Sequence, residues 1–181
     1  MIFRFYPRNM IKHGTLIASL LTMTLLAVIE KVESATILDT HEHGSAKLNI
    51  AADGNVIFIE FESPAANIVG FEQTPQTTDQ THRVDAAKSL LENLKSVFRL
   101  SDSAACRLDT AAVKWVDGTG GHTEFQAEYQ LICERIEGLE TIDVLLFNSF
   151  PDIEYIYVQA IFPARQIATE LSPGEHTIEL K

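Results

Sequence analysis

The chain has 181 residues, a formal net charge of −11 at neutral pH and 46% hydrophobic residues. This acidity argues against nucleic acid or anionic lipid as binding partners, because both carry negative charge. It is compatible with the attraction of cations, although most acidic protein surfaces serve solubility. The length allows one domain with a substantial hydrophobic core.

The N-terminus has the pattern of a secretion signal. Residues 16–29 are almost wholly apolar, follow three basic residues and precede the small residues of a cleavage site. Because this run is shorter than the roughly 20 residues of a membrane span, we expect a signal peptide over residues 1–35, with no membrane insertion after its cleavage. An uncleaved N-terminal anchor is the alternative. Translation could begin at Met1 or Met10.

Residues 36–181 are then expected to form a single domain with a net charge of −13, since the leader removes four basic and two acidic residues. Residues 45–51 alternate apolar and polar side chains, which predicts a strand with one buried face. Asp53 and Gly54 separate it from a β-rich run over residues 55–62. An Asp-Gly pair between two such runs is typical of a β-hairpin.

Two helices are expected next. In residues 63–67 (SPAAN) the serine would cap a short helix and the proline would occupy its first position, and Gly70 would end it. A long helix is expected over residues 79–99, with Thr77 and Gln80 forming a capping box. Its apolar stripe, at spacings of three and four, consists of Val84, Ala87, Leu91, Leu94 and Phe98. This stripe predicts packing against a sheet.

The two cysteines, Cys106 and Cys133, predict a hairpin closed by a disulfide. An even pair in an exported protein is typical of a disulfide, and two metal thiolates are the alternative. If the cysteines face each other, the glycine-rich residues 118–121 form the loop. The same register places Leu108 opposite Leu131, Thr110 opposite Tyr129, Ala112 opposite Ala127 and Asp117 opposite His122. A β-bulge would shift the pairing by one residue and exchange the faces.

The C-terminal part is predicted to consist of strands. They cover Thr141–Phe147, Glu154–Phe162, Gln166–Leu171 and Thr177–Leu180. Together with the earlier elements they predict an α+β domain, in which an antiparallel sheet of about seven strands packs against one long helix, with a short SPAAN helix beside it.

Three histidines are candidate metal ligands. His41 and His43 are two residues apart, so in an extended segment their side chains point to the same side. Both imidazoles could then bind one zinc ion at about 2.0–2.1 Å. A flexible polar arm without a fixed partner is the alternative for this pair.

His122 opens the second strand of the cysteine hairpin and by parity shares the polar face with Glu124 and Glu128. If the first strand lies near this end of the hairpin, His122 completes a three-histidine site suited to zinc or copper. A solvated loop histidine, paired with Asp117, is the alternative. We expect His82 and His176 to lie on the surface, outside any site.

Motifs of enzymes are absent from the sequence. It contains no HExxH, no GxSxG and no glycine-rich phosphate loop. The disulfide interpretation uses both cysteines, and no spacing of carboxylates indicates an acid–base pair. We therefore expect a binding protein and not an enzyme.

Several segments resemble the ZrgA-like family of exported bacterial proteins, once known only as a domain of unknown function. The resemblance lies in HEHGSAKLNIAADGNVIFIEFESPAANIVGFE, HTEFQAEYQLIC, LFNSFP and VQAIFP, and it covers about residues 40–181. It implies a periplasmic, zinc-responsive zinc-binding protein that assists a zinc uptake transporter. It also implies metal ligation by His41, His43 and His122, and it matches Cys106 and Cys133 to the family's cysteine pair.

The sequence departs from that family in one place. Many relatives carry a long histidine-rich insertion between the two cysteine-bearing strands, where this chain has only residues 118–121. High-capacity zinc scavenging is therefore not expected. The expected function is capture of zinc and its presentation to transporter components. The alternatives are a metal-independent module that docks through a strand edge and, disfavoured by the absence of a methionine-rich stretch, a copper-handling protein.

Overall fold

A computed structural model describes residues 43–117 and 122–180 of the chain. His41 and the expected signal peptide lie outside these residues, as does the glycine-rich loop over residues 118–121. Within the described ranges, no helix is long and apolar enough to cross a membrane.

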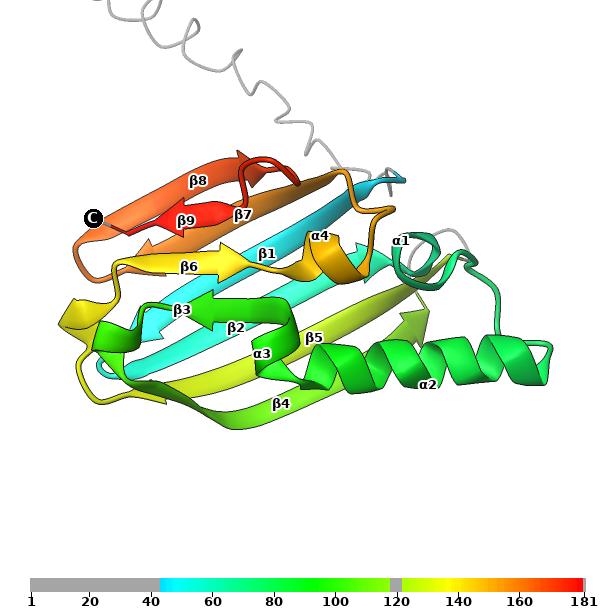
Figure 1. Cartoon of the computed structure of the whole chain (residues 1–181), viewed down its shortest axis with the longest axis horizontal. Coiled ribbons are helices and arrows are strands. Elements are labelled where there is room, and N and C mark those ends of the chain that lie inside the picture. Colours follow the sequence, from blue (N-terminus) through cyan, green and yellow to red (C-terminus); the bar gives the residue numbers. More distant parts are fainter. Residues whose placement is uncertain (1–42, 118–121, 181) are drawn as a thin grey trace, which may run out of the picture. The chain divides into compact units, whose positions relative to one another are not determined.

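The larger of two sheets has six strands in the order β4-β5-β2-β1-β7-β8 (Figure 1). The strands are β1 (Ser45–Asp53), β2 (Val56–Pro64), β4 (Cys106–Asp117), β5 (Thr123–Cys133), β7 (Tyr155–Phe162) and β8 (Arg165–Leu171). β1 pairs with β2 antiparallel, as the Asp-Gly turn predicts, but it pairs with β7 parallel. The sheet is therefore mixed, and the prediction of an antiparallel sheet is wrong at its centre.

A second, three-stranded sheet accounts for the remaining strands. It has the order β3-β6-β9, with β3 (Phe98–Leu100), β6 (Thr141–Val144) and β9 (Thr177–Glu179). The prediction of about seven strands in one sheet is thus also corrected. Short α-helices and 3-10 turns connect the strands: α1 (Ala65–Val69), α2 (Thr78–Glu92), α3 (Leu94–Val97), η1 (Asp102–Ala104), η3 (Ile136–Gly138) and α4 (Leu146–Ser149).

The predicted long helix ends early. The capping box of Thr77 and Gln80 is present, but α2 ends at Glu92, and Asn93 adopts an extended conformation. The Asn93 side chain then accepts a hydrogen bond from the Lys95 amide and starts the separate turn α3. This asparagine competes with the helical backbone by capping a new turn, so one continuous helix over residues 79–99 does not form.

Phe98 shows why its spacing was misleading. It belongs to β3 and pairs with Val144, and its ring packs edge-on against Tyr129 of β5, with ring centroids 5.4 Å apart. Its apolar side chain is buried as the helical stripe predicts, but a strand and not a helix delivers it to the core.

The core lies on one face of the large sheet. Figure 1 shows the helices and the small sheet in front of the six strands. Inward residues of neighbouring strands, such as Leu48, Ile59 and Phe125, are fully buried with Leu91 of α2. The Tyr129 hydroxyl also donates to the Leu91 carbonyl oxygen at 2.7 Å, which joins β5 to the end of α2.

The cysteine hairpin forms with a bulge. Cys106 and Cys133 are paired and bonded as a disulfide, and the next inward pair, Leu108 and Leu131, also has the predicted register. Between Leu108 and Thr110 the register shifts by one residue. From there the observed pairs are Thr110–Gln130, Ala111–Tyr129, Ala112–Glu128, Val113–Ala127 and Asp117–Thr123. The bulge therefore leaves His122 before the first residue of β5 and not opposite Asp117.

Candidate functional site

Two histidines from distant parts of the chain meet at one carboxylate. His43, just before β1, lies with Nε2 3.0 Å from Oε1 of Glu72, and His122, just before β5, contacts the other oxygen, Oε2, through Nδ1. An ionised carboxylate only accepts hydrogen bonds, so each imidazole donates to it. Two ring nitrogens and two carboxylate oxygens thus face one another.

The backbone around Glu72 is fixed on both sides. Gly70 ends α1 in the left-handed conformation, with φ of 82°, and turns the chain away from the helix. Phe71 packs its ring against Trp115 of β4, with centroids 6.0 Å apart. The Thr123 hydroxyl donates to the Glu72 carbonyl oxygen at 2.6 Å. These contacts leave only 15% of the Glu72 side chain exposed.

His43 is held through the residue that follows it. Gly44 has φ of 85°, a conformation that favours glycine. Its amide donates to Oδ1 of Asn67 at 2.9 Å. Its carbonyl oxygen accepts from the amides of Glu154 at 2.7 Å and Tyr155 at 3.0 Å. The backbone directly after His43 is therefore restrained on both sides of Gly44.

The electrostatics of the cluster keep Glu72 ionised. Burial raises the pKa of its carboxyl, but hydrogen bonds from His122 and His43 lower it by more, so that the pKa lies below the ordinary value of 4.5. At neutral pH the site presents a negative charge between two imidazoles. His43 and His122 remain 71% and 48% exposed, so a cation can reach the ring nitrogens from solvent.

The structure brings together two of the three predicted ligands. His43 and His122 share Glu72, whereas His41 lies outside the described residues. Of the carboxylates expected beside His122, Glu128 pairs with the ammonium of Lys114 at 2.9 Å. Glu72 was not among the ligands predicted from the sequence.

The two histidines assigned to the surface lie apart from this cluster in the fold. His82 is exposed on α2, and Nδ1 of His176 lies 3.3 Å from the Pro173 carbonyl oxygen. The signal in the sequence that points to Glu72 is weak: it lies two residues after Gly70, the glycine that ends α1, in the GFE end of the SPAAN-containing segment. An acidic residue held next to a helix end is a better ligand candidate than one in a mobile loop.

The residue types in this cluster are ones that bind zinc. Two imidazoles and one carboxylate are ligands typical of zinc sites that keep a fourth position open. In the arrangement seen here, hydrogen bonds occupy the facing atoms, and across residues 43–117 and 122–180 no group of three or more His, Cys, Asp or Glu side chains is placed to hold a metal ion. Both cysteines are used in the disulfide, so thiolate ligation does not apply.

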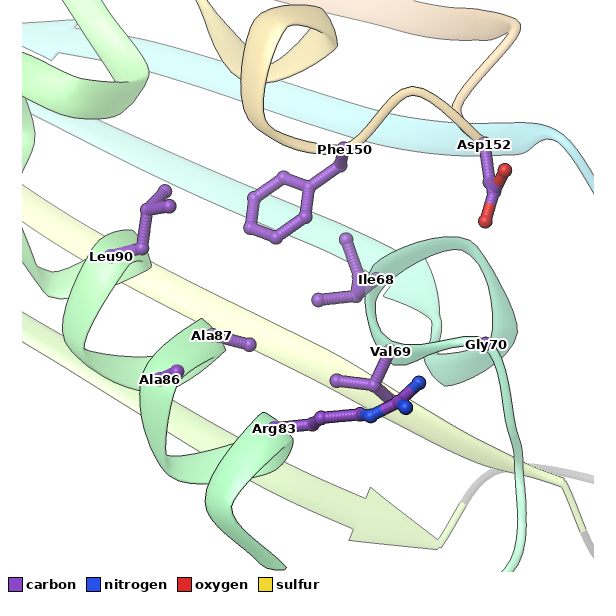
Figure 2. Close-up of a pocket in the computed structure, with 9 residues that line it drawn as sticks. All are labelled: Ile68, Val69, Gly70, Arg83, Ala86, Ala87, Leu90, Phe150 and Asp152. Carbon is purple, nitrogen blue, oxygen red and sulfur yellow. The ribbon is translucent and has the colours of Figure 1, made fainter. Parts of the chain in front are cut away.

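A separate groove lies between α1, α2 and the segment after α4 (Figure 2). Its volume is about 420 Å³, and most of its lining is apolar, from Ile68, Val69, Ala86, Ala87, Leu90 and Phe150. Arg83 and Asp152 provide its charged side chains. No histidine lines it, so the groove and the histidine cluster are distinct features.

The comparison with known protein families gives a match over the described domain. Residues 40–180 match the family described as ZrgA family zinc uptake protein. This match covers most of the chain and includes the three residues of the cluster. The protein therefore belongs to the ZrgA family, a class of proteins related to zinc uptake. No curated protein matches the chain significantly.

Proposed function

We propose that the protein is a periplasmic zinc-binding accessory protein, which captures zinc and presents it to the components of a zinc uptake system. The observation that carries the proposal is the convergence of His43 and His122 on Glu72. The family match supplies the link to zinc uptake. The disulfide is consistent with an oxidising compartment outside the cytoplasm.

In this proposal zinc takes the place of the N–H groups that donate to Glu72, and each imidazole keeps its one proton on the ring nitrogen that faces away from the ion. The ring nitrogens that face the carboxylate, Nε2 of His43 and Nδ1 of His122, bind the ion as neutral imidazoles. Glu72 contributes one or both oxygens and offsets part of the ionic charge. His41, two residues before His43, is a further predicted ligand on the spacing of the pair, and it would hold the fourth position until a ligand from a partner protein takes its place.

The exposure of the two histidines to solvent favours transfer of zinc to a partner protein over permanent storage of the ion. Structural zinc sites are closed by four protein ligands, whereas sites with three protein ligands keep a position for an exchangeable group. His43 is mostly exposed and His122 is about half-exposed, so a ligand from a partner protein can approach the ion. We propose no catalytic role, because the sequence contains no motif typical of an enzyme.

Isothermal titration of residues 36–181 with zinc tests the proposal. We expect one tight site that is weakened by His43→Ala, by His122→Ala and by Glu72→Gln. His82→Ala and His176→Ala are matched controls, because each removes an imidazole elsewhere, and they should leave the affinity unchanged. Equal zinc binding by all five variants and the unaltered protein would refute the proposal. Titration with copper under the same conditions tests the copper-handling alternative.

One observation favours the alternative that the protein is a metal-independent interaction module. The sheet face opposite the core exposes Phe58 of β2 together with Tyr155, Tyr157 and Ile161 of β7. Exposed aromatic residues are enriched where proteins bind each other. A module that works through this face would retain partner capture after loss of the histidines, and the zinc-dependent function proposed here would not.

A further inference from the structure

Asn67 is a buried polar residue whose side chain makes two of its three hydrogen bonds to the segment after His43. It is 3% exposed and lies on α1. Its Oδ1 accepts from the Gly44 amide at 2.9 Å, and its Nδ2 donates to the Ser45 carbonyl oxygen at 2.8 Å and to the Ser63 hydroxyl at 3.3 Å. A buried side-chain amide must have hydrogen-bond partners for both its carbonyl oxygen and its NH₂ group, and Asn67 has both.

These bonds act outside the sheet ladders. The pairing of β1 with β2 begins at Lys47, and its pairing with β7 begins at Ser45. Gly44 precedes both, so strand pairing alone does not fix the peptide unit between His43 and Gly44. The Asn67 carbonyl holds the amide of that unit, and the amides of Glu154 and Tyr155 hold the next one.

The same short segment also carries the carboxylate. Asn67 and Glu72 are five residues apart, joined by the end of α1 and the left-handed Gly70. One piece of backbone therefore holds both the chain next to His43 and the group that His43 contacts. His122 is held independently, through β5 and the bond from Thr123 to the Glu72 carbonyl oxygen.

We infer that Asn67 is a positioning residue of the zinc site: its side-chain amide fixes the backbone at Gly44 so that the imidazole of His43 meets Glu72. This inference rests on the proposed zinc-binding function. Asn67 itself touches no zinc. It acts by lowering the conformational freedom that His43 must lose on binding the ion, as supporting residues of metal sites do.

A double-mutant cycle separates this role from a general contribution to folding. Zinc affinity is measured by isothermal titration for the unaltered protein, Asn67→Ala, His43→Ala and His122→Ala, and for Asn67→Ala combined with each histidine variant. Loss of a supporting residue typically weakens metal binding about 10- to 100-fold, and we expect Asn67→Ala to fall in this range. Ser63→Ala, which removes the longest of the three Asn67 bonds together with the bond from Ser63 to the Pro64 carbonyl oxygen, is the mild control and should cost less.

The expected signature is selective. In the Asn67→Ala background, His43→Ala should weaken zinc binding by less than about twofold, because an unpositioned His43 contributes little. His122→Ala should keep its full effect in that background. If both histidine variants keep their full effects, Asn67 serves only the fold and the inference is overturned. If neither histidine variant weakens zinc binding in the unaltered protein, the proposed function itself fails, which is a different result.

A second variant covers the case in which Asn67→Ala does not fold, judged by loss of a cooperative thermal transition. Asn67→Asp keeps an acceptor for the Gly44 amide but replaces the donor to the Ser45 carbonyl oxygen with a carboxylate. We expect the His43→Ala effect to be smaller in the Asn67→Asp background than in the unaltered protein. An equal effect overturns the inference.

Discussion

Replacing Glu72 with glutamine tests the role of the carboxylate with the least change in shape. Glu72→Gln keeps the side-chain length and one acceptor oxygen but removes the charge that the two imidazoles contact. A hydrogen bond to a charged group contributes about 1.5–3 kcal/mol when it is well buried. Here His43 is 71% exposed and His122 48% exposed, so solvent screening reduces the two contacts together to about 1 kcal/mol.

Without zinc, this loss should lower the melting temperature by about 4 °C for a domain of this size. The larger effect should appear with zinc. At a free zinc concentration 100 times the dissociation constant, binding stabilises the folded state by about 2.7 kcal/mol. A tenfold weaker site in Glu72→Gln would lose about half of this stabilisation, since each factor of ten corresponds to about 1.4 kcal/mol.

Differential scanning calorimetry with and without zinc measures both effects on the same samples. Glu128→Gln is the matched control, because Glu128 is also a strand-side carboxylate in an ion pair, 2.9 Å from Lys114, but lies outside the cluster. Its zinc-induced rise in melting temperature should equal that of the unaltered protein. An equal rise for Glu72→Gln would show that the carboxylate takes no part in zinc binding.

Three further predictions concern the charge of Glu72, the backbone at Gly44 and the disulfide. The pKa of Glu72 in the folded protein is lowered from 4.5, so its stabilising contribution is complete above about pH 4.5 and is lost as the pH falls through the folded-state value. The difference in stability between the unaltered protein and Glu72→Gln, measured in urea, should therefore vanish in acid. Gly44→Ala should lower the free energy of unfolding of the zinc-free protein, measured in urea, by about 1–2 kcal/mol. The φ angle of Gly44 is 85°, and a Cβ there would lie 3.2 Å from side-chain carbons of Glu154. Unchanged stability would contradict this geometry. Replacing both Cys106 and Cys133 by serine should cost about 3–4 kcal/mol in the same assay, because the bridge spans 27 residues, yet the zinc stoichiometry by titration should stay the same; a lost site would implicate the hairpin closure in metal binding.

Local patterns in the sequence predicted local structure well. Alternation placed Ala46, Leu48 and Ile50 on the buried face of β1, and the Asp-Gly pair gave the β1–β2 hairpin. The capping box at Thr77 fixed the start of α2. These features depend on neighbours within a few residues, so single-sequence reasoning can reach them.

One local prediction failed through a competing contact. Ser63 does not cap α1: the N-cap is Pro64 without a side-chain bond, and the Ser63 hydroxyl donates to the Pro64 carbonyl oxygen and accepts from Asn67. The asparagine of the same SPAAN segment has the more important role, because it reaches back 23 residues to Gly44. Nothing in the local pattern distinguishes these two polar residues.

The non-local features needed the three-dimensional structure. The parallel pairing of β1 with β7 joins residues more than 100 positions apart. A pattern of apolar residues within one strand does not indicate which distant strand it pairs with. The bulge between Leu108 and Thr110 depends on how β4 fits β5 and the core, so the sequence could indicate its possibility but not its position. Glu72 belongs to the same class, because its importance arises only when two distant histidines reach it.

The most direct test is a crystal structure of residues 36–181 with zinc, in which anomalous scattering at the zinc absorption edge locates the ion. Our account predicts a zinc ion about 2.0–2.1 Å from Nε2 of His43 and Nδ1 of His122, with a Glu72 oxygen at about 2.0–2.2 Å. Anomalous density elsewhere on the protein, with the two histidines still hydrogen-bonded to Glu72 in the presence of saturating zinc, would contradict it.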